Sequence, residues 1–135
     1  MKYKKSYKGL IIWIILFFAI MVGIGFLPLS DSELYLRITT NVCTISISIL
    51  TYIIYKTQNI YWYNGIDYNE ALKISPEQRK LYALKHFKRF LTLSVIILMF
   101  SIIMHITSQN SWIDFVVGML GLIITAISTI KIKLI

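Results

Sequence analysis

The side chains best suited to chemistry are one histidine and three carboxylates that flank predicted hydrophobic segments. Asp31 and Glu33 follow the first segment, His105 lies near the end of the third, and Asp114 lies at the start of the fourth. If these segments cross a membrane, the four side chains lie near the same surface, where imidazole and carboxylates could bind a divalent cation or respond to pH. We favour a simpler arrangement, in which His105 hydrogen-bonds Asn41 or a hydroxyl group and the carboxylates lie in water.

Other motifs for catalysis are missing from the sequence. It contains no HExxH, no P-loop and no G-x-S-x-G pattern. Cys43 is the only cysteine, which excludes an internal disulfide, a CxxC redox pair and a cysteine-based zinc site. We therefore expect no catalytic residues, no cofactor and no bound metal, and we predict that the protein is not an enzyme.

The composition indicates a membrane protein. Hydrophobic residues make up 57% of the 135 residues and charged residues only 15%, with a mean hydropathy of +0.71. A chain of this length has room for a single domain, residues 1–135, and one small core cannot bury so much apolar surface. A lipid bilayer removes this difficulty.

Four long segments with little or no charge can cross a hydrocarbon core of about 30 Å as helices. We predict spans at residues 10–29, 38–55, 90–107 and 113–133. The lysine-rich start before the first span is similar to a signal peptide, but the apolar run is long and no A-x-A-like site follows, so we expect an uncleaved anchor. The predicted fold is an all-α integral membrane protein with four transmembrane helices in an up-down bundle.

Small and polar side chains recur at helical spacing in two of these spans. In the second span, the residues that share one face are Asn41, Thr44, Ser48 and Thr51. In the fourth span, they are Gly118, Gly121, Thr125 and Ser128. Lipid offers hydroxyl and amide groups no partner, and small residues let two helices approach closely. We therefore predict that both faces pack against other helices; the alternative is that the stripe of the second span lines a path for a solute.

The distribution of positive charge predicts the orientation. An even number of spans places both ends of the chain and segment 56–89 on one side, which then holds 13 of the 14 Lys and Arg residues and leaves only Arg37 opposite. The positive-inside rule makes that side cytoplasmic and the protein a multi-pass protein of the plasma membrane. The net charge of +8 then suits anionic lipid headgroups, and we expect no nucleic-acid partner. The abundance of Ile, Lys, Tyr and Asn is compatible with an AT-rich bacterial genome.

Segment 56–89 contains two predicted helix starts. Asp67 and Glu70 can cap a short helix, and residues 75–78 (Ser-Pro-Glu-Gln) form a second start that we expect to continue directly into the third span. The basic side of that second helix carries Arg79, Lys80, Lys85, Lys88 and Arg89, with His86 exposed among them, and its apolar side carries Ala83, Leu84, Phe87 and Leu91. This pattern is typical of a cytoplasmic amphipathic helix that faces headgroups with its basic side and acyl chains with its apolar side. The alternative is that this helix is a docking surface for another protein.

The size and the four-span layout resemble those of the small multidrug resistance family. That resemblance implies a proton-coupled transporter with an acidic residue in the first span, but the sequence has no acidic residue between Lys8 and Asp31. We predict instead a non-enzymatic accessory, regulatory or immunity-type protein that packs its helices against a membrane protein partner or a second copy. The alternative is an oligomeric transporter or channel for a small solute or ion, with the stripe of the second span lining its path.

Overall fold

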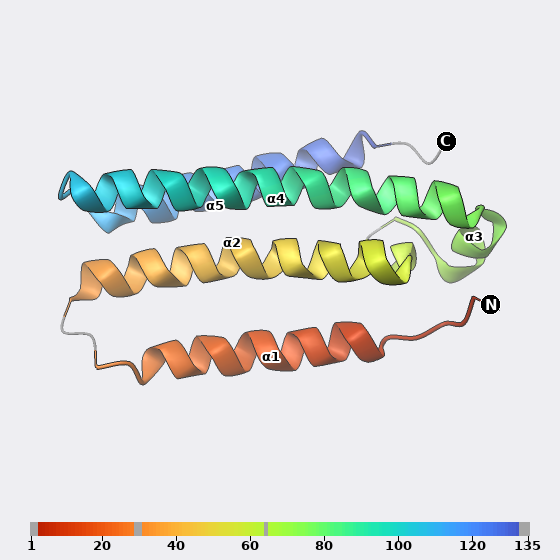
Figure 1. Ribbon diagram of the computed structural model, residues 1–135, viewed down its shortest axis with the longest axis horizontal. Helices are drawn as coiled ribbons and strands as arrows, with labels where there is room; N and C mark the ends of the chain where they lie inside the picture. The colour runs from red at the N-terminus through yellow and green to blue at the C-terminus, as the bar shows by residue number, and fades with distance from the viewer. Residues whose placement is uncertain (1–2, 29–30, 64, 133–135) are drawn as a thin grey trace.

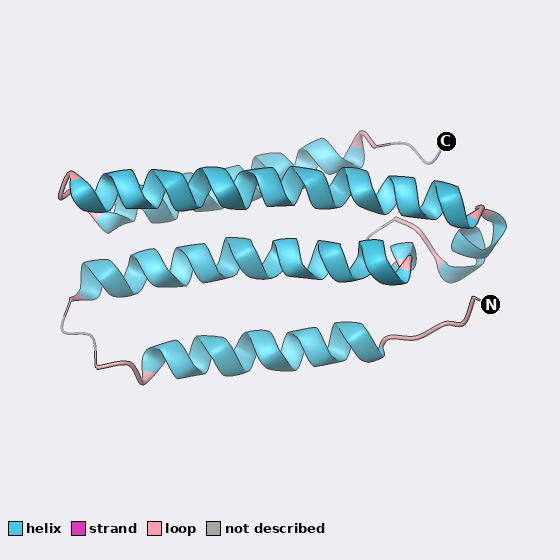
Figure 2. Cartoon of the chain, in the orientation of Figure 1, coloured by secondary structure: helices cyan, strands magenta, loops and turns pink. Residues whose placement is uncertain are grey.

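A computed structural model describes residues 3–28, 31–63 and 65–132. Its elements are α1 (Lys8–Gly25), α2 (Ser32–Thr57), the short 3-10 helix η1 (Ile60–Trp62), α3 (Tyr68–Lys73), α4 (Pro76–Ile106) and α5 (Ser111–Ile130). Every element in this part of the chain is helical (Figure 2). The helices α1, α2, α4 and α5 are long and apolar enough to cross a membrane, as expected of a multi-pass membrane protein.

The four long helices run along the long axis of the molecule, and successive helices are linked at alternating ends (Figure 1). The first described residues and α3 lie at the same end, which we call the α3 end, while the link between α4 and α5 lies at the far end. The helices α2, α4 and α5 all contact one another, whereas α1 packs against α2. The chain therefore builds a three-helix core, and α1 is attached to one member of it.

Side-chain caps determine where the helices begin. Asp31 caps α2, so this helix starts six residues before the predicted span and includes Arg37. Capping boxes start α3 and α4, and α4 continues without a break to Ile106, as the sequence predicted. Lipid-facing helices need such caps because their first N–H groups have no intrahelical partner.

The outer spans differ from their predicted limits. The first helix ends at Gly25, whereas the predicted span runs to residue 29, which lies outside the described residues. The last helix starts at Ser111 and ends at Ile130; the predicted end at residue 133 also lies outside the described residues. With 18 residues, α1 is about 27 Å long, which is close to the thickness of a hydrocarbon core.

Two glycines let α5 approach both of its neighbours. A Cβ atom added at Gly118 would lie 2.7 Å from Thr40 Cγ2 on α2, and one added at Gly121 would lie 2.7 Å from Leu93 Cδ1 on α4. Gly23 on α1 has no heavy atom within 4 Å of such a Cβ. The small residues of α5 therefore form contacts inside the three-helix core, as small residues do between membrane helices.

Substitution of Gly118 by alanine is expected to destabilise the core by about 1–3 kcal/mol, because the branched Thr40 side chain cannot move aside easily. Unfolding by a denaturing detergent in mixed micelles measures the change. The matched control, Gly23→Ala, is expected to leave stability unchanged or slightly higher. The double variant Gly118→Ala/Thr40→Ser removes the clashing methyl group and should recover most of the loss; no recovery would contradict this contact.

Candidate functional site

A buried ion pair joins the core helices near the far end. Arg37 on α2 donates through Nη1 to Asp114 Oδ2 on α5. The same Nη1 also contacts the Ser101 carbonyl oxygen on α4 at 3.3 Å, and Nη2 donates to the Gln109 carbonyl. The Arg37 residue is 5% exposed and Asp114 is fully buried. One guanidinium therefore connects α2, α4, α5 and the link between α4 and α5.

A second carboxylate strengthens the same end. Glu33 Oε2 accepts a hydrogen bond from the backbone N–H of Ser111, the first residue of α5. Asn110 caps that helix from its own side chain by accepting from the N–H of Trp112 at 2.8 Å. Negative charge at a helix N-terminus is favourable because the first N–H groups and the helix dipole present positive charge there. The carboxylates were expected to lie in water, but Glu33 accepts a hydrogen bond from the start of α5 and Asp114 pairs with Arg37 of α2.

The predicted cluster at the far end is brought together in part. Asp31, Glu33 and His105 line one pocket of about 410 Å³ together with Arg37, whereas Asp114, the ion-pair partner of Arg37, does not line it. His105 is exposed, and among the described residues no hydrogen bond joins its ring to Asn41 or to a hydroxyl group, although such a bond was expected. The Asn41 amide donates instead to Ser101 Oγ at 2.9 Å. Within the described ranges, no group of three metal-binding side chains is close enough to hold an ion.

The polar stripe of α2 faces α4. Ser48 and Ser94 share a hydrogen bond of 2.7 Å, and Ser94 Oγ lies 2.8 Å from the Thr44 carbonyl oxygen. The Thr44 and Thr51 hydroxyls bond backwards to carbonyls of α2 itself, at 3.0 and 2.9 Å. Among the described residues, Asn41 Oδ1 and Asp114 Oδ1 are buried without a partner. The hydroxyl groups of the stripe are therefore used within the chain, while Asn41 Oδ1 and Asp114 Oδ1 keep unused acceptor capacity. At the α3 end, the buried atoms Tyr63 Oη and Arg79 Nε also have no partner among the described residues.

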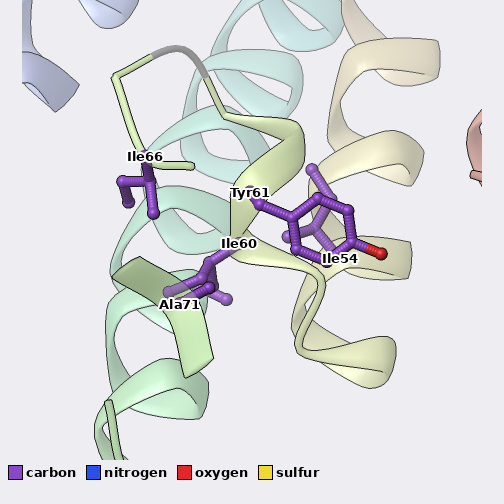
Figure 3. Packing of buried hydrophobic residues seen from close by; sticks show 6 residues of the cluster. Ile54, Ile60, Tyr61, Ile66 and Ala71 are labelled. Carbon is purple, nitrogen blue, oxygen red and sulfur yellow. The ribbon is translucent and has the colours of Figure 1, made fainter. Parts of the chain in front are cut away.

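At the α3 end, the first described residues close over a cap formed by η1 and α3. The backbone of Ser6 exchanges hydrogen bonds with the Tyr61 hydroxyl at 2.7 and 2.8 Å. Tyr3 Oη donates to the Gln58 carbonyl at 2.8 Å, and its ring stacks on Tyr68 with centroids 5.7 Å apart. Below this layer lies an apolar cluster of Ile54, Ile60, Tyr61, Ile66, Ala71 and Ala83, five of which are labelled in Figure 3. We call the whole assembly the aromatic cap.

Three residues of α4 predicted to face lipid or solvent belong to this cap. Arg79 is 6% exposed because it donates to the carbonyls of Ala71 and Ile74, at 3.0 and 2.7 Å, and lies over the Tyr3 ring. His86 is buried and stacks on Tyr63 with ring centroids 4.3 Å apart, and Ala83 is fully buried. The predictions that Arg79 and His86 lie on the basic surface, and that Ala83 faces acyl chains, are therefore wrong. The physical reason is that α3 and η1 fold back over this side of α4.

The other basic residues of α4 have more solvent access. Lys80, Lys88 and Arg89 are exposed and Lys85 is half-buried. Arg89 also donates to the Ser128 carbonyl near the end of α5, where helix carbonyls lack intrahelical partners. Thr125 and Ser128 lie on the α4 side of α5, in a groove with Lys88 and Arg89. Lys88 and Arg89 thus lie beside α5, a position that the sequence pattern did not predict.

Breaking the ion pair is expected to destabilise the protein strongly. Asp114→Asn leaves the Arg37 charge without its counter-ion and should cost about 3–5 kcal/mol in detergent unfolding. The double variant Arg37→Met/Asp114→Leu removes both charges and should cost clearly less than Asp114→Asn alone. The control Glu77→Gln removes an exposed carboxylate from the first turn of α4. Equal losses for Asp114→Asn and the control would show that the pair contributes nothing.

The docking of Tyr3 predicts a pH dependence. Burial raises the pKa of its phenol from 10.0 to about 12, although the Arg79 guanidinium opposes the shift. A pKa that is higher in the folded protein means that Tyr3 stabilises docking fully below pH 10 and loses this contribution as pH rises towards 12. The difference in phenolate absorbance between the unmodified protein and the Tyr3→Phe variant should therefore rise with pH and reach its midpoint near pH 12. A midpoint near 10 would mean that Tyr3 is free.

Comparisons of the chain with protein-family models, with curated protein sequences and with solved structures find no match.

Proposed function

We propose that the protein is a non-enzymatic accessory, regulatory or immunity-type membrane protein that acts by packing its helices against a membrane partner. In this proposal the four long helices form an up-down bundle in the plasma membrane, with both ends and the aromatic cap in the cytoplasm. The positive-inside rule supports that orientation, because 13 of the 14 Lys and Arg residues then lie on one side.

The position of α1 carries the proposal. Only 6% of its span is buried inside the protein, compared with 33% of the span of α2. Trp13 and Phe17 lie on the half-buried side of α1, and the Trp13 indole N–H donates to the Ser46 carbonyl of α2 at 2.9 Å. The opposite side presents Ile11, Ile15, Phe18 and Val22, each more than half exposed. A helix so weakly packed within its own chain has most of its surface free for another membrane helix.

The internal hydrogen bonds support packing over transport. A solute path along α2 needs polar groups that face water, but Ser48 bonds to Ser94 of α4 and the hydroxyls of Thr44 and Thr51 bond to α2. The ion pair of Arg37 and Asp114 is likewise formed inside the core. These polar groups favour one fixed arrangement of α2, α4 and α5, because breaking them within lipid is costly.

Photocrosslinking in cells tests the proposal. A benzophenone side chain placed at Ile11, Ile15 or Phe18 should give a discrete protein adduct, because these residues share one side of α1. The same side chain at Val95 or Ile102, which are also exposed on α4, should give a much weaker adduct. An adduct of twice the mass of this chain would identify a second copy as the partner.

Two results would contradict the proposal. The first is crosslinking to lipid alone at every α1 position, with a strictly monomeric protein in mild detergent. The second is solute or ion flux in proteoliposomes that is lost in Asn41→Ala and Ser48→Ala variants, because these residues belong to the stripe and not to α1.

A further inference from the structure

A groove of about 710 Å³ lies between α4 and α5, near the α3 end. Its lining comes from those two helices and from the residue that follows α5, and α1 and α2 contribute no residue to it. The groove is thus separate from the outer side of α1 on which the proposed function depends. It is also separate from the ion pair at the far end.

The mouth of the groove is positively charged. Lys88 and Arg89 line it from α4 and Lys131 lines it from the end of α5, and all three are exposed. Arg89 is held in place by its hydrogen bond to the Ser128 carbonyl. A guanidinium has five N–H donors, so this bond leaves others for an anion. Among the described residues that line the groove, none is acidic.

The three cations mark the polar boundary of both helices. In α4 the charge-free run begins at Phe90, directly after Arg89, and in α5 it ends at Ile130, directly before Lys131. Below this level the lining is apolar or hydroxylic and includes Leu93, Ile96, Ile124 and Thr125. Phosphate groups of a bilayer lie at this same boundary, with acyl chains directly below.

We propose that this groove is a binding site for one anionic phospholipid. Lys88, Arg89 and Lys131 bind its phosphate and any further negative charge of its headgroup. One acyl chain lies along the apolar floor formed by Leu93, Ile96 and Ile124. This assignment goes beyond general attraction between a basic protein and a membrane, because it places the lipid between two particular helices. The bound lipid also contacts both helices at the end opposite the ion pair.

Native mass spectrometry tests the site directly. Delipidated protein in a neutral detergent is titrated with dioleoyl phosphatidylglycerol, or with dioleoyl phosphatidylcholine, which has the same acyl chains and no net charge. One phosphatidylglycerol should bind much more tightly than phosphatidylcholine. Lys88→Gln and Lys131→Gln should each weaken that binding about fivefold, and the double variant about 25-fold, as expected for cations near an anionic headgroup.

The matched control is Lys73→Gln/Lys80→Gln, which removes the same charge from exposed positions outside the groove. It should leave binding nearly unchanged, and thermal unfolding of each variant without lipid verifies the fold. If Lys88→Gln/Lys131→Gln and the control weakened phosphatidylglycerol binding equally, general charge attraction would explain the binding and the proposal would be overturned. Equal binding of the two lipids would also overturn it. Inorganic phosphate should not displace the lipid; full displacement would show a simple anion site and overturn the assignment to a phospholipid.

Discussion

Arg37 is a charged residue on a helix that is otherwise apolar enough to cross a membrane, and the arrangement of the core follows from how its charge is satisfied. An uncompensated guanidinium is costly in lipid, so it needs an anion and further acceptors within the chain. Asp114 supplies the anion, and the carbonyls of Ser101 and Gln109 supply acceptors. These groups come from α4, α5 and the link between them, which fixes the position of three helices relative to one another. Gly118 and Gly121 then allow α5 to pack closely against Thr40 of α2 and Leu93 of α4.

The two ends of the molecule use different interactions. At the far end, charges and helix caps hold α2, α4 and α5 together. At the α3 end, aromatic rings and isoleucines form the cap, and Arg79 is the buried cation that ties α3, α4 and Tyr3 together. A charged pair that is buried in the protein gains from the low dielectric constant around it, whereas the cap resembles the small core of a water-soluble protein. This difference fits a chain in which only the α3 end extends well beyond the hydrophobic spans.

The sequence predicts the helices well because their signals are local. Long apolar runs must form helices in lipid, since only helices satisfy their own backbone groups there, and the capping residues Asp67, Ser75 and Pro76 lie beside the helices that they start. Contacts between distant segments were missed. Arg37 and Asp114 are 77 positions apart, and the available signal was that Arg37 is the one cation predicted on its side of the membrane. The burial of Arg79 and His86 was missed because helical periodicity shows which residues share a face, but not that α3 and η1 cover that face.

The outlying helix α1 is positioned without being buried. Its start follows Tyr3 and Ser6, which are bonded to the aromatic cap, and its middle is fixed on α2 through Trp13. The first attachment involves residues that precede α1, and the second involves the side of α1 that faces α2. Both therefore leave Ile11, Ile15 and Phe18 exposed. A surface that is held in place before binding loses less conformational entropy when a partner packs against it. In the proposed function, the three-helix core and the cap hold α1 in place, so that its exposed side can pack against a membrane partner.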